Sequence, residues 1–187
     1  MKIQIAISRK KTGVAVWLES LNLSNPIIGI VGKQLKISYF GTKTKINQRA
    51  SRAISGEFLR DELGDIGADF RQQEIESDGE KLKVQVWDVV VSKMTKSIRK
   101  RFYLGTKAVI LQMDGREMLD SLDEIIREIR QTSPRMKIAA VIDRSDDWAR
   151  ENEERIKRLL YGKGIFDILI TDGDTEEFQK FLKSLSK

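Results

Sequence analysis

From residue 35 onward, short apolar runs alternate with stretches of helical periodicity, and this alternation constrains the possible fold most. Strands are predicted over residues 36–40, 108–113, 138–142 and 165–170. Helical patterns are predicted over residues 47–55, 119–133, 147–161 and a closing stretch that carries Phe178, Phe181, Leu182 and Leu185. Apolar strands that alternate with amphipathic helices are typical of a parallel sheet with helices on both faces. A doubly wound α/β domain is therefore predicted.

A hairpin adds the antiparallel part of this sheet. Residues 72–77 and 81–87 alternate in polarity on either side of Asp78-Gly79, a dipeptide typical of tight turns. The second strand is expected to stop at Asp88, and aspartates at the carboxyl ends of strands are common at metal and phosphate sites of α/β proteins. The prediction is a mostly parallel, six-stranded sheet with one antiparallel edge strand.

The first 34 residues have a different pattern from the rest. Residues 3–7 and 14–18 alternate in polarity around Lys10-Lys11-Thr12-Gly13, which is a β-hairpin signal. We therefore divide the chain into a β-rich extension, residues 1–34, and a main domain, residues 35–187. Two roles for the extension remain open: extra strands that cover the main domain, or an edge that binds a partner or dimerises.

Composition excludes several classes of function. The chain has no Cys and no His, which rules out disulfides, thiol nucleophiles and zinc–thiolate sites and removes the usual general base. No apolar run approaches the roughly 18 residues of a membrane-spanning helix, and the first residues lack the apolar block of a signal peptide. We expect a cytoplasmic protein without a lipid anchor. The net charge of +6 suggests an acidic partner or surface.

Four segments in order resemble one family. They are LKISYFG at residues 35–41, GEF to DIGADF at 56–70, ESDGEKLKVQVWD at 76–88 and RFYLG at 101–105. Together they resemble Rab/Ras-like small GTPases, and the resemblance implies the P-loop NTPase-type fold of that family. The family's phosphate loop reads GxxxxGK followed by Ser or Thr. Here Gly41 begins the loop, but Ile46, Asn47 and Gln48 stand where the second glycine, the lysine and the hydroxyl are needed.

The other nucleotide contacts also depart from the family pattern. Asp65 stands at the switch threonine, Asp88 keeps the aspartate of DTAGQ, and Ser92 replaces the water-orienting glutamine. The family's NKxD motif is replaced by Asp143-Arg144-Ser145-Asp146. The Asp143 carboxylate is an acceptor and would face guanine N7, which is also an acceptor. The resemblance therefore implies no catalytic residue and a relict nucleotide pocket made of Gly41, Lys43, Lys45, Asp143, Arg144 and Asp146. No cofactor is expected. If a nucleotide does bind, GTP or GDP would bring Mg²⁺ to Asp65 and Asp88.

A partner-binding surface is the better preserved feature. Phe70, Trp87 and Phe102 match, by spacing, three aromatic residues with which Rab proteins bind partners. The alternative is that they only pack the hairpin against the sheet. A basic run stands beside them and contains Lys93, Lys96, Arg99, Lys100 and Arg101. We expect an acidic protein partner, with contact to an anionic membrane as a further option.

The hypothesis from the sequence is a degenerate small GTPase, a pseudo-GTPase, that acts as a protein-interaction module. The first alternative is a divergent but active GTP hydrolase that uses Lys43 or Lys45 with Asp65, Asp88 and Asp146. The second is a nucleic-acid-binding domain, suggested by the basic run. We do not favour it, because no recognition-helix, RNP or zinc signature is present.

Overall fold

The computed structural model describes residues 33–42, 68–77, 80–93 and 95–187. All of them belong to one unit, Gly32–Lys187. The predicted hairpin of the first 34 residues, the helix at 47–55 and the Asp78-Gly79 turn lie outside the described residues. The boundary between extension and main domain therefore stays a prediction.

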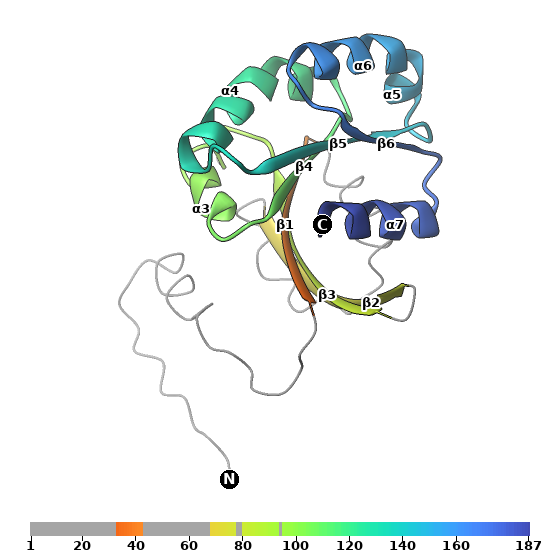
Figure 1. The fold of residues 1–187 in the computed structure, drawn as a ribbon. Helices are drawn as coiled ribbons and strands as arrows, with labels where there is room; N and C mark the ends of the chain where they lie inside the picture. The colour runs from red at the N-terminus through yellow and green to blue at the C-terminus, as the bar shows by residue number, and fades with distance from the viewer. Residues whose placement is uncertain (1–32, 43–67, 78–79, 94) are drawn as a thin grey trace, which may run out of the picture. The chain divides into compact units, whose positions relative to one another are not determined.

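Six strands form one sheet in the order β2-β3-β1-β4-β5-β6 (Figure 1). They are β1 (Lys33–Gly41), β2 (Ala68–Ser77), β3 (Glu80–Val90), β4 (Ala108–Gln112), β5 (Lys137–Asp143) and β6 (Asp167–Thr171). Only the β2–β3 pair is antiparallel; the other neighbours run parallel. The predicted mostly parallel sheet with one antiparallel edge strand is confirmed.

Helices cover both faces of this sheet (Figure 1). They are α3 (Arg99–Tyr103), α4 (Arg116–Thr132), α5 (Asp147–Glu151), α6 (Glu153–Gly162) and α7 (Thr175–Leu185). Helix α7 lies on one face, and the other four lie on the opposite face. Because strand side chains alternate between faces, Leu35, Ile37 and Tyr39 of β1 pack in the core under Phe178 and Leu182 of α7.

The buried face of helix α4 matches the periodicity of apolar residues in its sequence. Its buried residues are Met118, Leu122, Ile125 and Ile129, a three-and-four spacing that places them on one side of a helix. The helix ends at Thr132, just before Ser133-Pro134, as predicted. Within the described ranges, no helix has the length and apolar character needed to cross a membrane.

Several predicted boundaries were wrong: β2, for example, begins at Ala68 and not at residue 72. Two further differences have a visible physical cause. Strand β3 does not stop at Asp88 but continues through Val89 and Val90, which pair with Phe40 and Gly41 of β1. β-Branched side chains favour the extended backbone, so the valines lengthen the strand. The single helix predicted over residues 147–161 is two helices, because the chain leaves helical geometry at Asn152, whose side-chain amide donates to the Trp148 carbonyl at 2.9 Å.

Candidate functional site

The carboxyl ends of β3, β4 and β5 bring three buried acidic residues to one edge of the sheet. Asp88 lies within the end of β3, Asp143 ends β5, and Asp114 follows β4. All three act on the buried phenol of Tyr39, whose pKa is raised well above its usual value, first by burial and then by these negative charges. The Tyr39 hydroxyl also donates to the Gln112 side-chain oxygen. The edge is therefore strongly acidic.

The first residue after β1 is fixed by one of these carboxylates. Both the backbone N–H and the hydroxyl of Thr42 donate to Asp114, at 2.8 and 2.7 Å. The carbonyl of Gly41 accepts from the N–H of Val91 at 2.7 Å. Lys43 and Lys45 lie outside the described residues. The start of the candidate phosphate loop is thus bonded to the sheet edge itself.

The loop after β5 forms its contacts within the chain. Asp143 Oδ1 accepts from the N–H and the hydroxyl of Ser145, at 2.9 and 2.5 Å. Asp146 Oδ1 accepts from the N–H of Ala149 at 3.0 Å and so caps α5. We call residues 143–146 the base loop.

Arg144 of the base loop is tied to α6. Its Nε and Nη2 donate to the two carboxylate oxygens of Glu153, at 2.7 and 3.1 Å. Hydrogen bonds from Arg144, and next from Lys157, lower the pKa of Glu153 to about 2. A two-point pair of this kind fixes the orientation of the planar guanidinium.

The three predicted partner-binding aromatic residues lie in contact with one another. The ring centroids of Phe70 and Trp87 are 4.8 Å apart, and those of Trp87 and Phe102 are 5.4 Å apart. Trp87 and Phe102 are only 3% and 5% exposed, and Phe70 is partly exposed. We call these residues the aromatic row. The structure brings them together, and their role in binding stays a prediction.

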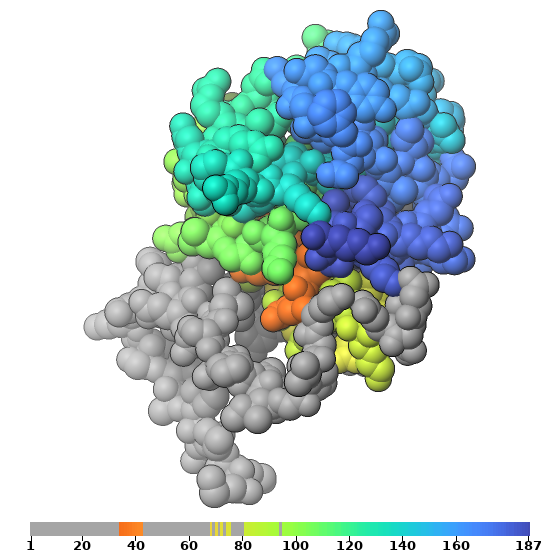
Figure 2. All heavy atoms as spheres, viewed as in Figure 1, coloured from red at the N-terminus to blue at the C-terminus, as the bar shows by residue number. Residues whose placement is uncertain are grey.

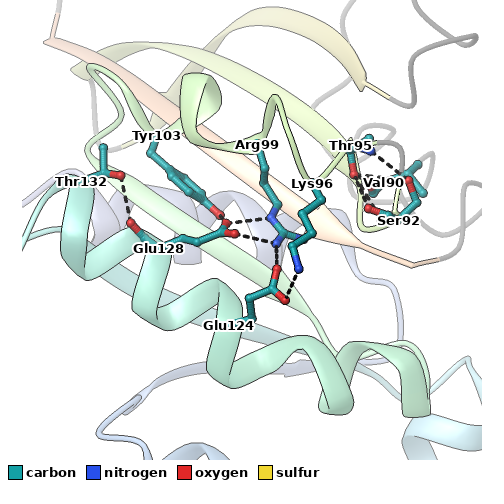
Figure 3. Close-up of polar contacts among 9 residues, drawn as sticks. All are labelled: Val90, Ser92, Thr95, Lys96, Arg99, Tyr103, Glu124, Glu128 and Thr132. Carbon is teal, nitrogen blue, oxygen red and sulfur yellow. Dashed lines mark hydrogen bonds and ion pairs between the residues drawn. The ribbon is translucent and has the colours of Figure 1, made fainter.

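The basic run divides into exposed and buried members. Lys93, Lys96, Lys100 and Arg101 are exposed, whereas Arg99 is 2% exposed. Arg99 donates to Glu128 through Nε and Nη2, both at 2.9 Å, and to Glu124 (Figure 3). Arg99 therefore joins α3 to α4 and does not belong to the exposed cationic surface.

Comparison with known proteins identifies the family of this chain. The family model described as "Ras of Complex, Roc, domain of DAPkinase" matches residues 41–146. The chain is 32% identical over 140 residues to Ras-related protein Rab-30 of Homo sapiens, covering 72% of this chain and 69% of that protein. It is 29% identical over 101 residues to Ras-related protein Rab-19 of Mus musculus, covering 52% of this chain and 46% of that protein. The chain belongs to the Rab/Ras-like small GTPase family.

In this small-GTPase-like chain, the metal residues of the sequence prediction are not brought together in the described part. Asp65 lies outside the described residues. Among the residues that the structure describes, no group of three or more acidic, His or Cys side chains is arranged to hold a metal ion. Asp88 is buried beneath the edge and pairs across the sheet with Tyr39 and Asp69.

Sequence reasoning missed the residues that fix α3 of the small-GTPase-like domain. Thr95 is fully buried; its hydroxyl donates to the Val90 carbonyl at 2.6 Å and accepts from the N–H of Ser92 at 3.1 Å (Figure 3). Glu124 and Glu128 accept hydrogen bonds from Arg99. The spacing of four between these two glutamates was the available signal, since it places both on one side of α4.

Proposed function

We propose that this small-GTPase-like domain is a pseudo-GTPase that binds a protein partner and does not hydrolyse GTP. The observation that carries the proposal is the base loop, in which Asp143, Arg144 and Asp146 all bond within the chain. In addition, the sequence places Ile46, Asn47 and Gln48 where a phosphate loop needs Gly, Lys and a hydroxyl.

The described residues of the sheet edge do not fit a magnesium-bound nucleotide well. The edge carries Asp88, Asp114 and Asp143, and a triphosphate is anionic. The N–H of Thr42, which begins the candidate phosphate loop, already donates to Asp114. Transition-state charge in phosphoryl transfer needs positive groups and backbone donors directed at the phosphates. These features support a domain that works without nucleotide.

Protein binding is the activity that the same region supports. The aromatic row lies in the segment that follows the family pattern, and exposed Lys93, Lys96, Lys100 and Arg101 adjoin it in sequence. Aromatic and cationic side chains together favour a partner with an acidic surface. We place this activity in the cytoplasm, with contact to an anionic membrane as a secondary feature.

Nucleotide content and thermal stability test the proposal. The full chain, purified without chelator, should release no guanine nucleotide on denaturation, and millimolar GDP or GTP with Mg²⁺ should leave its melting temperature unchanged. A ligand at 100 times its Kd would add about 2.7 kcal/mol to the free energy of unfolding. A Rab protein prepared in parallel is the positive control. Co-purifying GDP would contradict the proposal.

The second candidate is a divergent active GTPase. It is favoured by the 32% identity to Rab-30 and by the presence of Asp88 and Asp146 at family positions. Phosphate release from GTP separates it from the first. Turnover that disappears in Asp146→Ala, with folding unchanged by circular dichroism, would establish this candidate.

A further inference from the structure

The turn between α3 and β4 carries an exposed leucine. Leu104 is 61% exposed, and among the described residues only Tyr161 and Phe166 are other large apolar side chains with comparable exposure. In the space-filling view, the segment that carries α3 lies on the surface beside α4 (Figure 2). A single exposed leucine is common on proteins, so its surroundings decide whether it has a role.

The backbone of this turn is fixed from several sides. The Lys36 ammonium donates to the Leu104 carbonyl at 2.7 Å, and the N–H of Lys107 donates to the Lys36 carbonyl at 2.9 Å. Gly105 has a φ of +67°, a left-handed conformation that other residues rarely adopt. Thr106 donates from its hydroxyl to the Phe102 carbonyl at 2.7 Å. A rigid turn presents Leu104 with little conformational entropy left to lose on binding.

The charged residues that flank Leu104 in sequence are all basic. Lys100, Arg101 and Lys107 are exposed within four positions of it, and no acidic residue occurs between residues 89 and 113. On α4, Glu124 and Glu128 are paired with Lys96 and Arg99. Leu104 is therefore an exposed apolar side chain flanked in sequence by exposed cations.

We infer that the Leu104 turn is the anchor point for an acidic segment of a partner protein that carries one large apolar side chain. The inference rests on the proposed interaction function and names its contact. The partner's apolar group packs on Leu104 while its carboxylates pair with Lys100, Arg101 and Lys107. Membrane binding needs a broad apolar face, which one leucine among cations does not provide, so a protein segment fits better.

Peptide titration of the 15N-labelled full chain tests this contact. The probes are two 12-residue peptides rich in Glu that differ only in a central Leu or Ser. We expect the Leu peptide to shift the amide resonances of residues 99–107, and the Ser peptide to bind about tenfold more weakly, as expected for one lost buried leucine. Leu104→Ser should weaken binding of the Leu peptide by the same factor. Phe166→Ser, at a 73% exposed side chain just before β6, is the matched control and should have no effect.

The outcomes separate the anchor from the wider proposal. Equal affinities for the two peptides, or no shifts at millimolar peptide, would overturn the anchor. Binding of phosphatidylserine vesicles that depends on Leu104, without peptide binding, would also overturn it in favour of a membrane contact. If Phe70→Ala abolishes peptide binding while Leu104→Ser does not, the interaction function stands and the anchor fails. Co-purified GDP would contradict the proposed function and would not test the Leu104 contact.

Discussion

At the scale of single residues, Arg99 is a buried cation that joins α3 to α4. Its side chain is 3% exposed and contacts Glu128, which is 12% exposed, and Glu124, which is 40% exposed. The Tyr103 hydroxyl also donates to Glu128, at 3.2 Å. Burial, and next the charge of Glu128, raise the pKa of Tyr103, so the phenol stays a neutral donor. The fixed fork of a planar guanidinium suits this arrangement, in which Arg99 donates twice to Glu128 and also to Glu124.

Replacing Arg99 should strongly destabilise the domain. Arg99→Met leaves Glu128 without its cation in a largely buried position, and breaking a buried pair in this way costs about 3–5 kcal/mol. Urea unfolding of the full chain measures the change. Lys96→Met is the matched control, because Lys96 binds the same Glu124 from a 61% exposed position, where a pair is worth about 0–1 kcal/mol. Equal losses for the two variants would contradict the assigned role.

Glu153 should make stability depend on pH in the acid range. Its folded-state pKa of about 2, set by Arg144 and Lys157, is lower than the unfolded value of about 4.3. Its contribution is therefore complete above pH 4.3 and is lost as pH falls toward 2. We expect the stability difference between wild type and Glu153→Gln to shrink between pH 6 and pH 2. Glu154→Gln, on a neighbouring exposed side chain, is the control, and an unchanged difference would refute the assignment.

At the scale of elements, Thr95 connects the end of β3 to the start of α3. Thr95 bonds to Val90 and Ser92 on one side, and its carbonyl accepts from the N–H of Arg99 at 2.9 Å on the other. Val89 and Val91 are buried beneath. The strand end, the turn and the helix start therefore form one packed unit.

Removing the Thr95 hydroxyl tests this unit. Thr95→Val keeps the shape but leaves the Val90 carbonyl and the Ser92 N–H without this partner, which should cost about 1–3 kcal/mol. Amide hydrogen exchange around Thr95 should become faster than in wild type. Ser97→Ala, at an exposed site nearby, should change stability by less than about 0.5 kcal/mol. Unchanged exchange in Thr95→Val would show that the turn is held by other contacts.

Element type was predictable, and element ends were less so. The three-and-four spacing in α4 and the continuous apolar runs of β4 and β5 arise from burial, which sequence periodicity reports directly. The end of β3 was missed because strand pairing of Val89 and Val90 with β1 is a tertiary effect. The break at Asn152, where the side-chain amide donates to the Trp148 carbonyl, is a local feature that periodicity does not record.

At the scale of the whole molecule, the mostly parallel six-stranded sheet and its one antiparallel edge strand followed from the sequence, and so did membership of the small-GTPase family. The roles of particular charges did not. Arg99 and Lys100 are neighbours in one basic run, yet one is buried and paired while the other is exposed. Which of them faces α4 depends on where Glu124 and Glu128 lie after folding. A sequence pattern identifies a cationic segment, and only packing separates its members.

If the domain is a pseudo-GTPase, as proposed, the extension of β3 has a consequence for variants designed to hydrolyse GTP. The substitution Ser92→Gln would not be sufficient for GTP hydrolysis, because the backbone just before residue 92 is hydrogen-bonded in the sheet. Val89 and Val90 pair with Phe40 and Gly41, and the N–H of Val91 donates to the Gly41 carbonyl. A hydrolytic variant would first have to lose the strand pairing between the ends of β1 and β3. Under the proposed function, one substitution at Ser92 is therefore not expected to produce a GTP hydrolase.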